Sequence, residues 1–297
     1  MILNLKYCST FLLTYLFYFS LSAQIQEPIL ATVTYQFIHI NDTNHRANPI
    51  KMEMFLKLGK TNSVYNNASL ENQMKEAQKK SEQAAASSLT RSVQGFPIAV
   101  VSSAEMNSDY FFQIPSKKRL IRYSNLGIQD YRMDMELPNF NWVIESENKK
   151  IGNYSCQKAV GNYAGRKYIA WFTTELPFQY GPWKLSGLPG LILEATDTKN
   201  EVQFIFKELF KNTVQESIEI MSLKPVTISE SAFEKSKKNF ELDPSGGVQA
   251  FLPPGSEPVP ASYIDASGRM LEGAEAKVAI KKNASKKTNN PIELVKN

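Results

Sequence analysis

The sequence predicts a mainly β protein: a curved antiparallel meander that forms an open or partly closed barrel, with one or two accessory helices. Three observations lead to this prediction. Several segments alternate apolar and polar residues, turn residues separate them at intervals of about ten residues, and two stretches have the composition of helices. With 297 residues and 42% hydrophobic composition, the chain is long and apolar enough to bury a core.

The alternation is clearest in residues 50–58, IKMEMFLKL, where every second residue is apolar and those between are mostly charged. Residues 131–137, YRMDMEL, repeat the pattern, and residues 33–37 alternate in the same way. A period of two places one face of each strand against a core and the other in water. Further strand-like runs cover 97–102, 110–114, 118–123, 141–146, 153–160, 166–173, 190–196 and 202–209.

A meander of this many strands must bend, because the twist between neighbouring strands accumulates. Its apolar side must then be filled by its own side chains or by a helix. Residues 68–92 are rich in helix formers, but Leu70, Met74 and Ala77 give only a narrow apolar stripe, which predicts a helix packed loosely on the surface. Residues 228–240 form the second candidate helix, with Ser229 as its N-cap, and could lie across an open end of the sheet.

The N-terminus predicts export. Residues 1–23 combine Lys6, an apolar run over 11–19 and small residues that end at Ala23, which is typical of a secretory signal peptide. An uncleaved anchor is the alternative, although the run is shorter than the about 20 residues that span a bilayer. No second run approaches that length, so we expect no transmembrane span in the mature chain.

After the signal peptide, residues 24–242 are expected to form a single β-rich domain with the helical insertion 68–92. Residues 243–297 are rich in Pro and Gly and later in Lys, so we expect a mostly disordered tail. Cys8 would leave with the signal peptide, and Cys156 alone cannot form an internal disulfide. The net charge of +5 is weak evidence for nucleic-acid binding, and no nucleic-acid partner is predicted.

The stretch GLPGLILEA, residues 187–195, is an apolar turn that leads into a strand. Pro189 and Gly190 suit the second and third positions of a type II turn, in which Gly190 takes a positive φ. The strand that follows is apolar on both faces and needs cover on both sides. We therefore expect the turn to fold inward, against Trp171 and Trp183, and to plug the core; a ligand-binding turn is the alternative. The structural motif comprises Gly181, Pro182, Gly187, Leu188, Pro189, Gly190, Leu191 and Ile192.

Three elements in order carry a family resemblance: GNYSCQKA at 152–159, YGP at 180–182 and GLPGLI at 187–192. In this combination the chain resembles the GLPGLI family of secreted Bacteroidetes proteins over residues 140–210, and more weakly over 29–140. Asn153 separates a Gly and a Tyr that adjoin in the family pattern. The resemblance implies a periplasmic or outer-envelope protein. The family has no established activity, so it implies no catalytic residues.

Signals for catalysis or metal binding are few. His39 continues an alternating strand and His45 lies in a polar loop, so both are expected to be ordinary surface histidines, with no metal and no cofactor. Cys156 lies on a strand without a neighbouring base and is expected to be a buried, inert thiol. Glu175 and Glu194 could form a carboxylate pair, but exposed carboxylates, or carboxylates paired with Lys184, are the simpler expectation.

Signals for binding are stronger. A cluster of large residues beside Pro and Gly is a candidate concave binding site; it comprises Trp171, Phe178, Tyr180, Trp183 and Leu188. We therefore expect a non-enzymatic cell-envelope protein that binds an apolar ligand, a lipid or a peptide, in a curved sheet. The alternative is an accessory protein that binds an outer-membrane or periplasmic partner, and a thiol- or carboxylate-based hydrolase is the third hypothesis.

Overall fold

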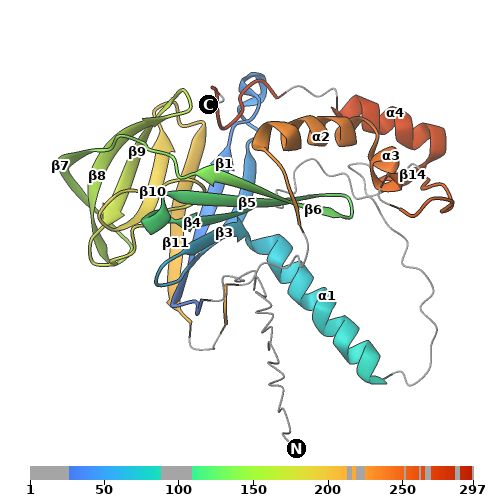
Figure 1. Ribbon diagram of the computed structural model, residues 1–297. Helices are drawn as coiled ribbons and strands as arrows, with labels where there is room; N and C mark the ends of the chain where they lie inside the picture. Colours follow the sequence, from blue (N-terminus) through green and yellow to red (C-terminus); the bar gives the residue numbers. More distant parts are fainter. Residues whose placement is uncertain are drawn as a thin grey trace, which may run out of the picture.

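The computed structural model describes residues 27–87, 109–212, 216–218, 225–250, 252–260, 262–264, 269–284 and 288–295. Within them, one twelve-stranded sheet dominates the molecule (Figure 1). Its strands are β1 (Ala31–His39), β2 (Ile50–Leu58), β3 (Ser63–Asn67), β4 (Tyr110–Ile114), β5 (Arg119–Leu126), β6 (Gln129–Glu136), β7 (Val143–Ile151), β8 (Tyr154–Tyr163), β9 (Arg166–Thr173), β10 (Leu191–Asp197), β11 (Val202–Lys211) and β12 (Val226–Thr227). The mainly β prediction is confirmed.

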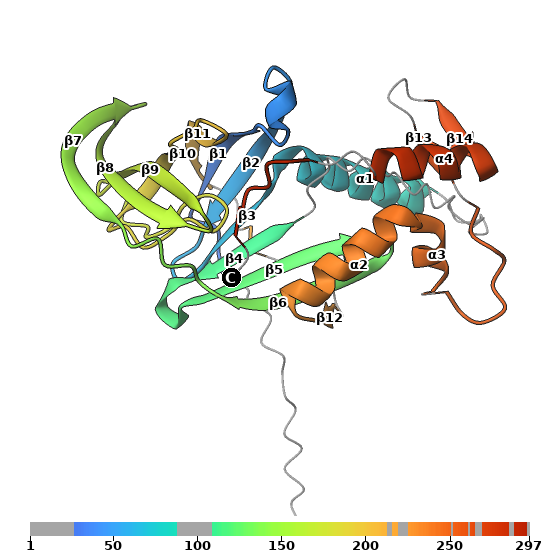
Figure 2. The same cartoon turned by 90° about the horizontal axis from the view of Figure 1, so that it is seen from above.

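The first strand lies in the middle of the sheet. The strand order is β12-β6-β5-β4-β3-β2-β1-β11-β10-β9-β8-β7, so one meander runs outward from β1 to β6 and a second runs from β7 back to β11. Neighbouring strands are antiparallel except for β12, which is parallel to β6. The sheet curves strongly but does not close, which leaves β7 and β12 at its edges (Figure 2).

The inner, concave face carries the main core. The central strand β1 contributes Val33, Tyr35 and Phe37, and Phe204 of β11 packs beside them, with a ring-centroid distance of 5.2 Å to Phe37. The opposite, outer face is covered over β3–β5, where Val64 and Phe112 pack with Ile29 and Ile218 of two flanking segments. This second layer explains why every residue of β3 is buried and why β3 shows no alternation in the sequence.

Helix α1 (Ala68–Ser87) confirms the helical insertion as far as residue 87, and residues 88–92 lie outside the described part. It is attached through its first turn, where buried Glu71 accepts hydrogen bonds from Lys57 and Asn66 at 2.6 and 2.7 Å. Helix α2 (Glu230–Leu242) begins after Ser229, whose side chain accepts from Ala232 N as expected of an N-cap. No helix among the described residues is both long and apolar enough to cross a membrane.

The C-terminal region differs from the expected disordered tail. It contains α3 (Pro244–Gln249), the hairpin β13 (Ser262–Ile264) and β14 (Met270–Glu272), and α4 (Gly273–Ala284), which gather at one end of the molecule (Figure 1). Residues 288–295, here called the strap, return to the main sheet. The prediction of disorder depended on how few apolar residues this region contains. The strap is held mainly by polar side chains, which such a prediction does not take into account. The predicted signal peptide, 1–23, and the predicted strand 97–102 lie outside the described residues.

Candidate functional site

Residues 176–190, here called the plug, connect β9 to β10 and lie on the inner face. The plug folds back on itself: Tyr180 and Ser186 form an antiparallel bridge, and Leu185 N donates to Pro182 O at 3.0 Å. It is joined to the start of β10 by Ile192 N, which donates to Tyr180 O at 3.0 Å. The plug is therefore a compact unit.

The plug fills the core as the sequence predicts. Trp183 and Leu188 are 5% and 1% exposed, and Leu191 and Ile192 at the start of β10 are fully buried. The Trp183 ring stacks on Phe204, with centroids 6.1 Å apart. Burial of these apolar side chains is the main stabilising contribution of the segment.

The predicted turn geometry is wrong at Gly190. The positive φ belongs to Gly187, at 89°, and Gly190 is not among the residues with positive φ. Gly190 is needed for space instead, because a Cβ atom there would lie 2.1 Å from the carbonyl oxygen of Thr173. Gly181 is similarly confined, with Ile192 Cδ1 and Leu185 O both 2.9 Å from the position of a Cβ.

Three polar side chains hold the backbone of the plug and of β10. Gln113 Nε2 donates to the carbonyls of Gly181, Trp183 and Leu185 at 3.0, 2.9 and 3.2 Å. Trp142 Nε1 donates to Ser186 O at 2.8 Å, and Tyr35 OH donates to Ile192 O at 2.6 Å. Burial raises the pKa of Tyr35 well above its ordinary value, so its hydroxyl remains a donor.

The backbone of Trp183 is strained. Its φ is 56°, in the left-handed region that residues with a Cβ rarely adopt. The Gln113 hydrogen bond and the stacking on Phe204 hold it there. Such strain costs about 1–3 kcal/mol and persists only where the surroundings impose it.

The five residues predicted to form a binding cluster differ in their surroundings. Tyr180, Trp183 and Leu188 belong to the main core, and half-buried Phe178 packs at its margin. Half-buried Trp171 alternates along β9 with the buried residues Ala170 and Phe172, so its side chain leaves the sheet on the outer face, where it also packs against the margin of the main core. There Lys149 Nζ lies 4.6 Å from the centroid of its ring. Of the two tryptophans expected against the turn, Trp183 is buried in the main core, and Trp171 is half-buried at its margin.

A buried ionic network that the sequence did not predict lies beside the plug. The Lys184 side chain is 3% exposed and pairs with Glu293 of the strap at 2.5 Å and with Glu230 of α2 at 3.5 Å. Arg122 of β5, also on the inner face, contacts Asp109 at 2.9 Å and Glu230 and Glu234 of α2 at 3.4 and 3.1 Å. Burial disfavours the charge of Arg122, but these carboxylates outweigh it and raise its pKa. Because the partners are distant in sequence, no local pattern predicts them.

A second buried network contains His39 and Arg166. His39 is 6% exposed, which corrects the expectation of a surface histidine. The strap covers it, and His39 Nε2 lies 2.7 Å from Asn290 O. Burial lowers the pKa of His39 despite this hydrogen bond. His45 is exposed and contacts Asp42 at 2.7 Å.

The groups that could support catalysis are separated or occupied. Cys156 is fully buried, and burial, followed by the charge of Glu194, raises the pKa of its thiol to about 11. Glu194 pairs with Lys149, and Glu175 accepts from Ser155 N at 2.8 Å, so the two carboxylates do not form a pair. Among the described residues, no group of three His, Cys, Asp or Glu is placed to hold a metal ion.

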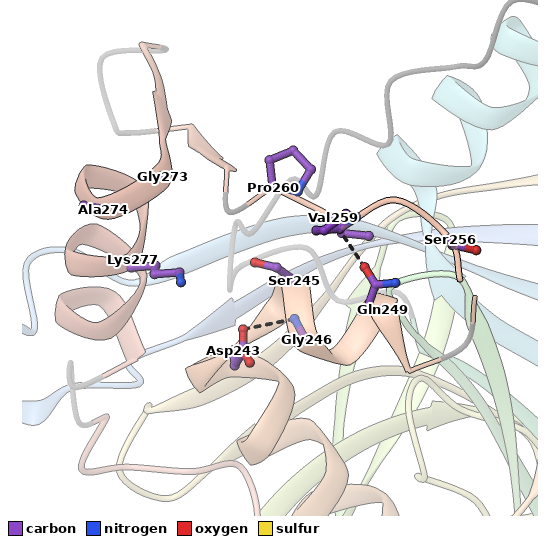
Figure 3. A pocket seen from close by; sticks show the side chains of 11 residues that line it. Asp243, Ser245, Gly246, Gln249, Ser256, Val259, Pro260, Gly273, Ala274 and Lys277 are labelled. Carbon is purple, nitrogen blue, oxygen red and sulfur yellow. Dashed lines mark hydrogen bonds between the residues drawn. The ribbon is translucent and has the colours of Figure 1, made fainter. Parts of the chain in front are cut away.

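A pocket of about 720 Å³ lies away from the plug, between α3, α4 and the segment around Val259 (Figure 3). Its walls are built mainly from small residues and prolines. Gln249 Oε1 accepts from Val259 N at 2.7 Å and Asp243 Oδ1 accepts from Gly246 N at 3.0 Å, so both polar side chains hold the local backbone. None of the residues of the predicted binding cluster lines it.

Comparison with known proteins gives limited matches. A family model described as a protein of unknown function (Porph_ging) matches residues 164–194, which cover β9, the plug and the start of β10. Membership of the GLPGLI family stays a prediction. Comparison with curated proteins gives no match.

Among solved structures, the chain is similar to PNGF-II in two crystal forms, in space groups C2 and P21. Each match has 13% sequence identity and covers 70% of this chain and 32% of that one, with TM-scores of 0.49 and 0.48. The chain thus spans about a third of the length of these solved chains. A likeness this distant carries no argument about function.

Proposed function

We propose that this protein is a non-enzymatic cell-envelope protein that binds another protein through the outer face and the edge of β7–β9. The observation that carries the proposal is a row of cross-strand neighbours on that face: Val143, Val160, Ile169 and Thr196. We call these four residues the outer row. They lie opposite one another in register, so their side chains share one face of the sheet.

The outer row reaches the edge of the sheet as an exposed apolar surface. Val143 is 65% exposed, and Val160 and Ile169 are half-buried. The labelled helices lie toward β2–β6 and leave the face of β7–β9 uncovered in both views (Figures 1 and 2). The neighbouring charges are largely paired with one another, as Lys158 is with Glu145 and Glu147 at 3.0 and 2.9 Å. A partner would therefore meet an apolar strip bordered mostly by charges that already have partners.

Strand β7 supplies the second part of the surface. It ends the strand order, so one side of its backbone has no strand partner among the described residues. Such an edge can accept a strand from another protein. Its charged residues and the irregular register between Ile144 and Asn148 limit pairing to its beginning, where Val143 and Ile144 are exposed.

The other two hypotheses agree less well with the packing. An apolar ligand held by Tyr180, Trp183 and Leu188 would have to displace the plug, because these side chains are already buried against one another. A thiol-based hydrolase needs an accessible thiolate, and Cys156 is buried with a raised pKa. Partner binding requires neither change.

Site-specific photo-crosslinking in the native cell envelope tests the proposal. A crosslinker placed at Val143 should give a discrete protein adduct, while one at exposed Lys79 on α1 serves as the matched control. Ile169→Lys places a charge in the outer row without entering the core, and it should abolish the Val143 adduct. Equal adducts from both positions, or an adduct that survives Ile169→Lys, would contradict the proposal.

A further inference from the structure

The strap contacts residues that run from the end of β1 to the turn between β8 and β9, and these contacted residues are here called the groove. It contains no helix or strand, and it is the dark red segment that runs beside the main sheet to the C label in Figure 2. Asn289 Oδ1 accepts from Thr43 N at 2.8 Å at one end, and Leu294 N donates to Ala164 O at 2.9 Å at the other. The contacts along the strap are those by which a protein recognises a peptide.

Every polar group of Asn290 has a hydrogen-bond partner on the folded protein. Its side-chain Nδ2 donates to Ile40 O at 2.6 Å, and its Oδ1 accepts from Arg166 Nη2 at 2.6 Å. Its backbone N donates to Asn41 O at 3.1 Å, and its carbonyl lies 2.7 Å from His39 Nε2. Only an amide side chain satisfies both an acceptor and a donor in this way. At 4% exposure, any other residue would leave a buried group unpaired.

Arg166 gives the strongest evidence for a site. Its side chain is 1% exposed, and its charge is balanced by Asp197 and Glu201 at 2.7 and 3.2 Å. The strap receives its other hydrogen bonds, through Asn290 Oδ1, Pro291 O at 2.7 Å and Ile292 O at 2.8 Å. Without a peptide in the groove, a buried guanidinium would lose these partners.

The next two residues of the strap are also recognised. Ile292 packs against the main core, and the carboxylate of Glu293 pairs with buried Lys184. By contrast, Leu294 and Val295 are 43% and 56% exposed. Recognition is therefore concentrated in the four residues Asn290 to Glu293.

We propose that this groove is a recognition site for extended peptide segments of the type Asn-Pro-aliphatic-Glu, with the strap as its resident ligand. A partner protein that presents such a segment binds by replacing the strap. This site lies on the inner side of the sheet and is independent of the outer row.

The test begins by separating the strap from the folded protein. A protease site replaces residues 285–287 in the full chain, and the purified protein is cut after folding. A fluorescent peptide with the sequence of residues 288–295, TNNPIELV, should then bind in a saturable manner. The same peptide with Asn290→Asp or Glu293→Lys should bind at least about tenfold more weakly. The control peptide with Val295→Ala should bind unchanged.

A folded, cut protein that fails to bind TNNPIELV, or that binds the Asn290→Asp peptide equally well, would overturn the proposal. If cutting unfolds the protein, the uncut chain with Asn290→Asp gives the same decision. In this variant the added wild-type peptide should displace the weakened strap and bind, whereas the Asn290→Asp peptide should not bind. Absence of such binding to this variant would equally overturn the proposal.

Discussion

The two halves of the sheet fill the same concave face with different chemistry. Over β7–β11, the plug fills it with apolar side chains such as Trp183 and Leu188, and neutral hydrogen bonds hold the backbone. Over β4–β6, the face carries Arg122 among carboxylates of α2, beside a small apolar cluster around Phe233. Where the plug lies, the first half depends on shape and volume, and its buried charges, Arg166, Asp197 and Glu201, lie at the end that the strap covers. The second half depends on balanced charge. The two should therefore respond to different substitutions.

The largest expected effect is in the half that contains the plug. Gly190→Ala would place a Cβ atom 2.1 Å from a backbone carbonyl oxygen, which no side-chain movement relieves. We expect a loss of at least about 4 kcal/mol in the free energy of unfolding, or failure to fold. Gly255→Ala is the control: its φ is 86°, but nothing lies within 4 Å, so strain alone should cost about 1 kcal/mol. Urea unfolding monitored by circular dichroism measures the free energy of unfolding of both variants. If both lost the same amount, the backbone of Thr173 would not approach residue 190 as closely as described.

In the other half, Arg122→Met should lower the free energy of unfolding by about 2 kcal/mol, because it removes a largely buried cation and leaves Asp109, Glu230 and Glu234 close together without it. Arg119→Met on the same strand is the matched control. Arg119 pairs with Asp134 at the surface and is 40% exposed, so its removal should change stability by less than about 1 kcal/mol. A small effect of Arg122→Met in the same unfolding experiment would mean that charge balance does not hold this half.

A third variant tests how much the hydrogen bonds from Gln113 stabilise the plug. Gln113→Leu introduces an apolar side chain of similar size and removes the donor shared by three plug carbonyls. We expect a loss of about 2 kcal/mol, since the buried carbonyls lose their partner. Thermal unfolding of this variant beside wild type gives the value. An unchanged stability would show that packing alone positions the plug.

The pH dependence tests the ionic network under the strap. The pKa of His39 is lowered in the folded protein from the ordinary histidine value of about 6.5. When the pH falls below that ordinary value, His39 therefore takes up a proton more readily in the unfolded chain than in the folded protein. Stability should therefore fall between neutral pH and about pH 5. Glu201, whose pKa is also lowered, acts only at lower pH.

His39→Gln should remove the part of this slope that lies above about pH 5, and His45→Gln should leave it in place. The measurement is the free energy of unfolding across the pH range. A slope that persists in His39→Gln would assign it to another group, since Arg166, Asp197 and Glu201 also face His39.

The smallest effect on stability is expected in the outer row. Val143→Lys changes an exposed side chain and should alter the free energy of unfolding by less than about 0.5 kcal/mol. If the proposed surface is correct, the same variant should nevertheless lose its partner in a pull-down from envelope extracts. If Val143→Lys instead lowered the free energy of unfolding strongly, the loss of the partner could be due to unfolding. The claim that the outer face serves binding and not stability would then fail.

Much of this arrangement could be predicted where one face of a strand is wet. The alternation in residues 50–58 and 131–137 predicts β2 and β6, and the apolar residues after Gly190 predict burial on both sides. Strand β3 has no period because both of its faces are covered. The role of Gly190 depends on how close Thr173 comes, and that of Arg166 depends on a strap more than a hundred positions away. Such contacts leave no local pattern in a single sequence.

The same limit applies to the candidate site. The sequence predicted that Trp183 and Leu188 turn inward, because a strand that is apolar on both faces needs cover. It grouped Trp171 with them by proximity along the chain, whereas the alternation of β9 puts Trp171 on the other side. The strap was missed because Asn290 and Glu293 look like ordinary polar residues until their buried partners are known.

Amide hydrogen exchange of the plug tests the central claim most directly, namely that the plug permanently fills the concave face. Leu191 N donates to Leu176 O and Ile192 N donates to Tyr180 O, both beneath buried side chains. These two amides should exchange only when the whole protein unfolds, with the same protection as the central strand β1. Exchange within minutes, while β1 stays protected, would show that the plug opens and would contradict the account.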